Sequence, residues 1–364
     1  SQIFAIWRLS QFRLGRQATD CNDFIIHFLS SYLFIRRKDD KMKKSEKYIY
    51  RSILMKSKGL LHRLLLAVTI VITAIYCYHQ IQIQLEQPLR QPLGQTVTIK
   101  NKNMNVLVEG KGNKTLVFLA GGGTTSPILD FQTLTSRLKD DFRIIVVEKF
   151  GYGFSDDIDE EREIQTIVAD TRSALKQLGI QGELILCPHS LSSLEALYWA
   201  NHYPDEVEAI VGLDMAFPAS YQTMDIKSSL FHALSFASHF GITRFFPSLA
   251  NQPALNQTYL SNQEKATYQA LLHYRPISTN ILNELEELKE NADIVNNLAT
   301  PSIPMLLFVS NSDGTGFTRA EWLGYAHQFC KKANNIKIIQ LDCPHYVHDY
   351  LPQQIAEQIK EFAR

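Results

Sequence analysis

The sequence shows no excess of charge of one sign, little cysteine and none of the common nucleotide- or zinc-binding motifs. It has 364 residues with 37 basic and 37 acidic side chains, so nothing in the charge balance points to nucleic acid as a partner. Its five cysteines are too few and too irregularly spaced for a disulfide framework or a zinc site. There is no P-loop, no G-x-G-x-x-G and no H-E-x-x-H, and we expect neither a metal nor an organic cofactor.

What the chain does have is one long apolar segment near its beginning. Residues 64–85 contain no Asp, Glu, Lys or Arg, and their most apolar part is residues 64–78. This part lies near the lower length limit for a membrane-spanning helix, which needs ~20 apolar residues. Tyr76 and Tyr78 suit the interface between lipid and water. We therefore predict a transmembrane anchor at residues 64–85 that associates the chain with the lipid bilayer.

The charges on the two sides of this segment predict its orientation. Residues 41–63 carry eight Lys and Arg against one acid, Glu46, whereas residues 64–100 carry only Arg90 and Lys100. Basic residues stay on the cytoplasmic side, so we expect a single-pass protein whose main domain lies on the extracytoplasmic side. A cleaved signal peptide is the alternative, but no clean A-x-A site follows the apolar run. A buried core helix is a third interpretation, which the basic flank disfavours.

The first 41 residues look unlike the rest of the chain. They show no sustained helical or strand period, and IRRKDDK, which ends at Lys41, can be encoded by a purine-rich stretch of the kind that binds ribosomes. We therefore expect the natural protein to start at Met42 or Met55.

The remaining sequence divides by pattern and composition. The predicted parts are residues 1–41 as a doubtful leader, 42–63 as a basic cytoplasmic tail, 64–85 as the anchor, 86–94 as a polar linker, 95–214 with 301–364 as a core domain, and 215–300 as a helical cap. The core alternates short apolar strands with amphipathic helices, which predicts an α/β fold with a mostly parallel sheet covered on both faces. The predicted strands are residues 97–100, 105–110, 115–120, 143–148, 183–187, 208–214, 304–310 and 336–342, and helical periods occupy residues 164–180 and 352–363.

Three residues with catalytic chemistry follow three of these strands. Ser190 follows 183–187 and opens a helix, Asp313 follows 304–310, and His345 follows 336–342. Because ligands bind at the carboxyl ends of parallel strands, we expect these side chains to converge at one edge. A serine nucleophile needs a base, and the base needs an acid to orient it. Taken singly, Ser190 fits a helix N-cap and Asp313 fits a turn, and His345 has His348 as a rival.

Residues 95–364 resemble the α/β-hydrolase fold, and are similar to membrane-anchored bacterial members of that superfamily. The resemblance rests on five stretches in order: LVFLAGGGTTSP, VVEKFGYGFSD, LCPHSLSSLEALYWANHYPDEV, LLFVSNSDGTGF and CPHYVHDYLPQQIAEQIKEF. It implies a serine hydrolase with the chain order Ser, acid, His, acting on a small-molecule ester or, less readily, an amide. It favours His345 as the base, with Pro352 starting the next helix, and leaves Asp214, at the end of a neighbouring strand, as the alternative acid.

The resemblance also implies an oxyanion hole. One backbone N–H is expected from Leu191, the residue after the nucleophile. The other is expected from the glycine run, with Gly122 as the first choice and Gly121 as the second. His189 is expected to support the site or line the pocket rather than act as the base.

The nucleophile motif departs from the usual G-x-S-x-G. Pro188 and Ser192 stand where glycines are common. Pro188 restricts the residue before it to extended geometry, which the end of a strand already has, and Ser192 is small, so we predict an intact elbow. The alternative function is a non-catalytic hydrolase-fold protein that binds a ligand or partner at the cell surface, for which the altered motif is the best argument.

Overall fold

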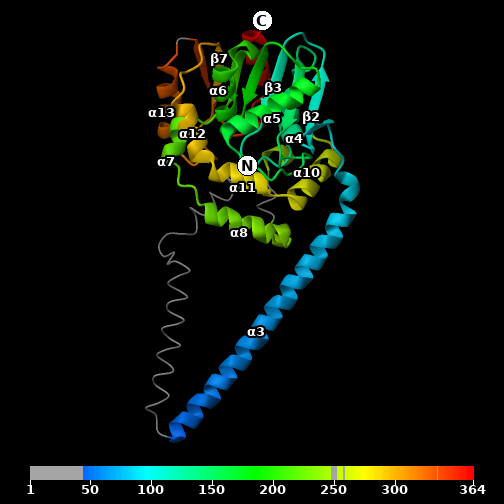
Figure 1. Cartoon of the computed structure of the whole chain (residues 1–364), viewed down its shortest axis with the longest axis vertical. Helices are drawn as coiled ribbons and strands as arrows, with labels where there is room; N and C mark the ends of the chain where they lie inside the picture. Colours follow the sequence, from blue (N-terminus) through cyan, green and yellow to red (C-terminus); the bar gives the residue numbers. More distant parts are fainter. Residues whose placement is uncertain (1–43, 247–251, 257–258, 334) are drawn as a thin grey trace. The chain divides into compact units, whose positions relative to one another are not determined.

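A computed structural model of the chain describes residues 44–246, 252–256, 259–333 and 335–364 (Figure 1). The described residues form two compact units, one from Ile81 to Arg364 and one that ends at Gln80. The predicted leader, residues 1–41, lies outside the described residues.

The larger unit is built on a sheet of eight strands in the order β1-β2-β4-β3-β5-β6-β7-β8. The strands are β1 (Gln95–Ile99), β2 (Lys102–Gly110), β3 (Thr115–Leu119), β4 (Arg143–Glu148), β5 (Leu184–Pro188), β6 (Val207–Leu213), β7 (Met305–Val309) and β8 (Ile336–Gln340). β1 pairs with β2, and β2 with β4, in antiparallel register, and all other neighbours are parallel. The predicted entry hairpin and the mostly parallel sheet are confirmed.

Helices connect the strands. They are α4 (Pro127–Thr135), α5 (Ile164–Gln177), α6 (Ser193–His202), α7 (Pro218–Thr223), α8 (Ser228–His239), α10 (Asn262–Tyr274), α11 (Thr279–Glu286), α12 (Leu288–Asn296), α13 (Arg319–Cys330), α14 (Val347–Tyr350) and α15 (Pro352–Phe362), with short 3-10 turns η1 (Gln87–Leu89), η2 (Ser190–Ser192), η3 (Pro204–Glu206), η4 (Ile242–Phe245) and η5 (Pro253–Asn256).

The alternation of side chains along each strand produces two cores. In β3, Leu116 and Phe118 pack on one face with residues of α4 and α15, whereas Val117 and Leu119 pack on the other with residues of α5, α6 and α13. Both faces of the strand are therefore buried, and the strand reads as a continuous apolar run. Burying each large aliphatic side chain in this way contributes about 1.5–3 kcal/mol.

The helices α7, α8, α10, α11 and α12 lie between β6 and β7 in the sequence and form the insertion on the sheet (Figure 1). α7 and α12 pack on each other, and α12 also contacts α6 of the core. Residues of the insertion, including Phe231, Ile281 and Leu285, belong to the same hydrophobic core as α5 and α6. The exact domain boundaries stay a prediction.

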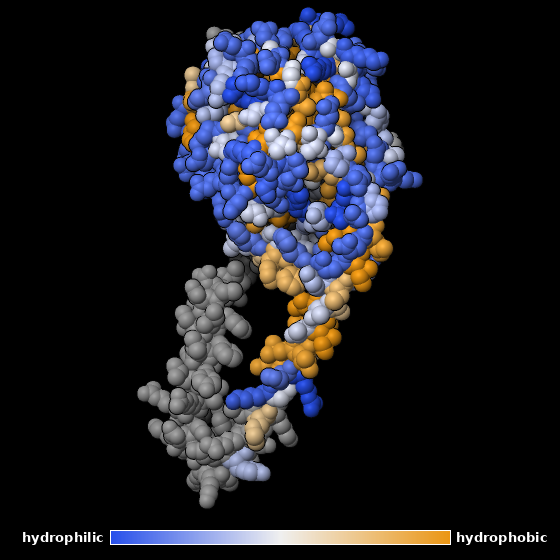
Figure 2. All heavy atoms as spheres, turned by 45° about the vertical axis from the view of Figure 1, so that its right-hand side comes forward, coloured by the Kyte–Doolittle hydropathy of each residue, from blue (hydrophilic) through white to orange (hydrophobic). Residues whose placement is uncertain are grey.

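A long helix, α3 (Lys44–Leu85), precedes the first strand. Its part from Lys58 to Leu85 includes an 18-residue stretch with a mean hydropathy of 2.0, and this part is long and apolar enough to cross a membrane. Figure 2 shows apolar side chains, in orange, along most of this part. Most of its large apolar side chains, such as Leu64 and Ile70, are exposed, which contradicts the interpretation as a buried core helix.

Candidate active site

Ser190 lies at the sharp turn between β5 and η2, which leads directly into α6. Its φ of 55° is in the left-handed region, where residues with a side chain are uncommon. This strained turn is the geometry of a nucleophile elbow, which lifts the hydroxyl clear of both flanking elements. The carbonyl of Ser190 accepts a hydrogen bond from the N–H of Ala216 at 3.0 Å, so the segment after β6 holds the turn.

The residues that replace the usual glycines fit this elbow. Pro188 is the last residue of β5 and pairs with Leu119, so its fixed φ continues the strand, as predicted. The hydroxyl of Ser192 accepts a hydrogen bond from the N–H of His189 at 3.0 Å and donates to the carbonyl of Leu119 at 2.6 Å. A serine at this position therefore ties the turn to β3.

Three side chains from different strand ends form one hydrogen-bonded chain. Nε2 of His345 lies 2.8 Å from Oγ of Ser190, and Nδ1 of His345 lies 2.6 Å from Oδ2 of Asp214. The other oxygen of Asp214 accepts from the backbone N–H of Ser310 and from the indole N–H of Trp322, both at 2.8 Å. Asp214 is buried with both oxygens occupied, so it holds the imidazole in one orientation.

Asp313, the acid favoured by the sequence, does not take this position. Its side chain is exposed, and it is the carbonyl of Asp313 that accepts a hydrogen bond from the backbone N–H of His345, at 2.8 Å. Asp214 directly follows the last residue of β6, whereas Asp313 stands four residues past the end of β7 in a loop. As the partner of His345, Asp313 is therefore a wrong prediction, and Asp214, the alternative acid, is in contact.

The other two histidines of the region lie beside this chain. Nε2 of His189 lies 3.2 Å from the carbonyl of His345, and because a carbonyl only accepts, this nitrogen donates. Burial, with a further contribution from His345, lowers the pKa of His189 well below its usual value, so this ring is neutral. Nε2 of His348 contacts Asp130 instead of Ser190, at 3.2 Å.

The glycine run after β3 passes against the nucleophile. A Cβ at Gly121 would lie 2.8 Å from Nδ1 of His189 and 3.0 Å from Cβ of Ser190, so only glycine fits there. The N–H of Gly123 donates to the hydroxyl of Tyr152 at 3.2 Å. Leu191, Gly122 and Gly121 stay predictions as oxyanion donors, and the close approach of the glycine loop is the geometry that this role needs.

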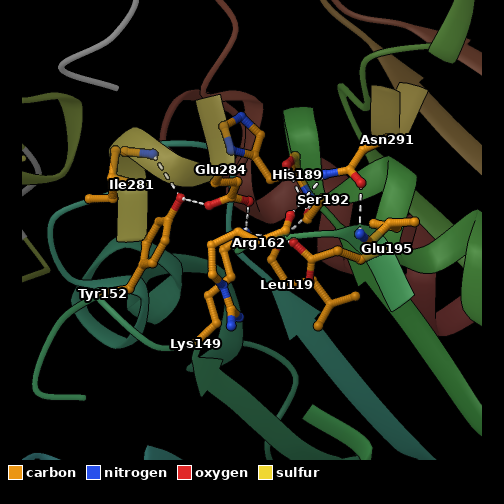
Figure 3. Close-up of polar contacts among 12 residues, drawn as sticks. Leu119, Lys149, Tyr152, Arg162, His189, Ser192, Glu195, Ile281, Glu284 and Asn291 are labelled. Carbon is orange, nitrogen blue, oxygen red and sulfur yellow. Dashed lines mark hydrogen bonds and ion pairs between the residues drawn. The ribbon is translucent and has the colours of Figure 1, made fainter. Parts of the chain in front are cut away.

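A buried polar network that the sequence does not predict contacts this loop through Tyr152, and Figure 3 shows Tyr152, Lys149, Glu195 and Glu284 of this network. The hydroxyl of Tyr152 lies 2.5 Å from Glu284 of α11, and Nζ of Lys149 lies 2.5 Å from Glu284 and 2.6 Å from Glu195 of α6. Burial alone would lower the pKa of Lys149, but Glu195 and Glu284 outweigh it and raise that pKa above its usual value. The ammonium therefore stays charged, and it neutralises carboxylates from the core and from the insertion.

Comparison with known proteins identifies relatives over most of the chain. No family model matches it. The chain is 32% identical over 311 residues to the uncharacterized protein YbdG of Bacillus subtilis (strain 168), covering 82% of this chain and 94% of that protein. It is also 32% identical over 122 residues to the 2-(acetamidomethylene)succinate hydrolase of Mesorhizobium japonicum, of which it covers 42%.

Solved structures share the fold at low sequence identity. The epoxide hydrolase VrEH1 of Vigna radiata aligns with a TM-score of 0.60 and 17% identity over 74% of this chain and 97% of that one. A putative lipase of Acinetobacter baumannii AYE aligns with a TM-score of 0.58 and 16% identity over 78% and 95%. The chain therefore belongs to the family of YbdG, and its sheet order and its structural neighbours show that it has the α/β-hydrolase fold.

Proposed function

We propose that this protein is a serine hydrolase that cleaves an ester bond, and less readily an amide bond, through an acyl intermediate on Ser190. The observation that carries the proposal is the pair of hydrogen bonds that joins Ser190, His345 and Asp214, at 2.8 and 2.6 Å. A merely ligand-binding relative would have no physical need for this chain of contacts. The altered motif, the best argument for that alternative, leaves the strained turn in place.

In the proposed reaction, His345 removes the proton of Ser190 while the serine oxygen attacks the carbonyl carbon of the substrate. Asp214 stabilises the imidazolium that forms, and it keeps Nε2 aimed at the serine. The backbone N–H groups of Leu191 and Gly122 donate to the negative oxygen of the tetrahedral intermediate. His345 then gives its proton to the leaving group, and water releases the acyl group by the same steps in reverse.

The chemistry of serine favours acyl substrates over the substrates named in several structural neighbours. Attack by Ser190 on an epoxide or an alkyl halide would form an ether. An ether has no carbonyl for water to attack, so the enzyme would not turn over. An acyl-serine ester does have such a carbonyl, and we therefore propose a carboxylic ester or amide as the substrate.

Labelling with a fluorophosphonate probe tests the proposal directly. The wild-type protein should react at Ser190, and Ser190→Ala should not react. His345→Ala should remove nearly all turnover of a short p-nitrophenyl ester, whereas His348→Ala should retain turnover. A folded wild-type protein that stays unlabelled would favour the binding alternative.

We further propose that α3 anchors the protein in a membrane, with the hydrolase unit on the extracytoplasmic side. Two features support this: the apolar part of the helix between Lys58 and Leu85, and the eight basic residues among residues 41–63, which lie before and at the start of that part. The substrate would then reach the protein outside the cytoplasm.

A further inference from the structure

A second group of titratable side chains lies next to the site and takes no part in the proposed reaction. Asp130 comes from α4, and His348 and Asp349 come from α14. Each residue offers one atom that could bind a metal ion, and these three atoms all lie within 4.8 Å of one another. All three are buried, with exposed fractions of 1%, 0% and 2%. We call these three residues the acidic cluster.

The unpaired atoms of the acidic cluster are all hydrogen-bond acceptors. Nε2 of His348 lies 3.2 Å from Oδ2 of Asp130, and because a carboxylate accepts, this nitrogen carries the proton. Nδ1 of His348 is then a lone pair. Within the described part of the chain, neither this nitrogen nor either carboxylate oxygen of Asp349 has a hydrogen-bond partner. Buried polar groups are almost always paired, so these three acceptors together lack a donor or a Lewis acid.

Within the described part of the chain, no lysine or arginine forms an ion pair with Asp130 or Asp349. The ion pair of the cluster in this part is internal, between Asp130 and His348. The rings of Phe131 and Tyr346 lie 4.8 and 5.6 Å from the ring of His348 and make the surroundings apolar. A negative charge in such surroundings is costly unless a cation accompanies it.

We propose that the acidic cluster binds a small cation through Asp349, Nδ1 of His348 and Asp130. The ligand is a divalent metal ion or the protonated amino group of an organic molecule, since both bring a compact positive charge to lone-pair acceptors. One imidazole with two carboxylates is a donor set that suits zinc or manganese. The hydrogen bond from His348 to Asp130 selects the tautomer that presents Nδ1, an arrangement common around metal-binding histidines.

The ring of His189 lies between the acidic cluster and the proposed catalytic base, His345. The ring of His189 lies 4.8 Å from that of His348 and 4.7 Å from that of His345. If Ser190 acts as proposed above, an organic amine bound here would place the rest of its molecule beside the reacting serine, and a metal ion would instead be a fixed part of the site wall.

Thermal unfolding tests the proposal on the full chain in detergent micelles after treatment with EDTA. The probes are ZnCl2, MnCl2, CaCl2 and methylammonium chloride, each compared with NaCl at equal ionic strength. At a hundredfold excess over its Kd, at least one cation should raise the Tm of wild type by roughly 5 °C. Asp349→Asn should lose this shift.

Mass-spectrometric metal analysis after gel filtration distinguishes a metal ion from an organic amine as the ligand. A bound metal gives about one equivalent of metal per protein chain, whereas methylammonium gives none.

The exposed residue Asp342 provides the matched control, because Asp342→Asn makes the same change in a carboxylate outside the acidic cluster and should keep the full shift. Ser190→Ala should also keep it, so loss of hydrolase activity and loss of cation binding are distinguishable. If Asp349→Asn fails to fold, Asp130→Asn takes its place. The proposal is overturned if no cation shifts the Tm of wild type, or if the shift survives in the cluster variants; Asp349 is then a neutral acid.

Discussion

At the scale of single residues, Asp214 divides its two carboxylate oxygens between different tasks. One oxygen accepts from Ser310 and Trp322, and the other accepts from His345. In Asp214→Asn, the amide oxygen can keep the first two bonds, which turns the amide NH2 toward the imidazole. His345 must then carry its proton on Nε2, where it cannot accept the proton of Ser190. We expect kcat for a p-nitrophenyl ester to fall about 10⁴-fold, with the fold retained.

Asp313→Asn is the control for this experiment. The same change is made in an exposed side chain, and the backbone carbonyl of Asp313, which accepts from the N–H of His345, is unaltered. Activity should stay within a few-fold of wild type. If Asp313→Asn lost activity and Asp214→Asn kept it, the assignment of the acid from the hydrogen bonds would be wrong.

Tyr152 links the glycine loop to the insertion through a single hydroxyl. Tyr152→Phe would keep the ring and leave the N–H of Gly123 and the carboxylate of Glu284 without this partner. We expect a loss of stability of about 1–3 kcal/mol in urea unfolding. We also expect kcat to fall about tenfold with KM nearly unchanged, because a misplaced loop weakens transition-state contacts more than binding.

Tyr325→Phe removes a hydroxyl that contacts Thr223 at 2.7 Å outside this network, and should leave kcat unaltered. A structural effect alone would lower the stability of Tyr152→Phe without changing kcat. That result would remove Tyr152 from the group of residues that position the loop.

At the scale of elements, the end of β4 carries a carboxyl group whose ionisation opposes folding. Burial raises the pKa of Glu148 from 4.5 to about 7, although hydrogen bonds from the N–H of Phe154 and the amide of Asn105 lower it. The folded state therefore holds a proton that the unfolded state has released. The stability that this proton provides is complete below pH 4.5, is lost as the pH rises to about 7, and changes no further above that.

Glu148→Gln removes this titration. The free energy of unfolding of wild type should fall by about 3 kcal/mol relative to Glu148→Gln between pH 4.5 and 7.5. Urea unfolding of both proteins across this pH range measures the difference between their free energies of unfolding. Taking this difference removes the contribution of all other titrating groups. Parallel pH profiles for the two proteins would show that Glu148 is ionised in the folded state at all these values.

Elements with strong periodicity were predictable from the sequence, whereas side-chain pairing was not. β4 has the predicted bounds, and β5, β6 and β7 lie within two residues of theirs, because runs buried on both faces are apolar from end to end. The acidic partner of His345 depended on which of two neighbouring strands is followed by an inward-facing carboxylate. The left-handed φ of Asp214, 48°, which turns that carboxylate, leaves no signal in the sequence.

The polar network and the acidic cluster were not predictable from the sequence either, because their members come close only in the folded structure. Glu284 and Glu195 are far from Lys149 in the sequence, and no sequence motif links the three residues. They come together only because α11 and α6 pack in the folded structure. His348 was considered only as a rival base, and nothing in its neighbourhood in the chain points to Asp130 of α4.

At the scale of the whole molecule, the proposed membrane anchor predicts where the protein is found. We expect the natural protein to sediment with membranes, to resist extraction by alkaline carbonate and to be released by detergent, because its Lys58–Leu85 part is long and apolar enough to span a bilayer. Protease added to intact cells should digest the hydrolase unit if the basic flank lies inside. Recovery in the soluble fraction would exclude the anchor, and full protection from protease would reverse the orientation.

The hydroxyl of Tyr152 also has a consequence for the timing of catalysis. Glu284 belongs to the insertion, so any outward displacement of α11 that admits a substrate would withdraw the carboxylate from Tyr152 and leave Gly123 less firmly held. A molecule that is too large to let α11 return would be bound without being cleaved efficiently. Discrimination between substrates would then arise from the return of one helix, and bulky compounds would act as competitive inhibitors.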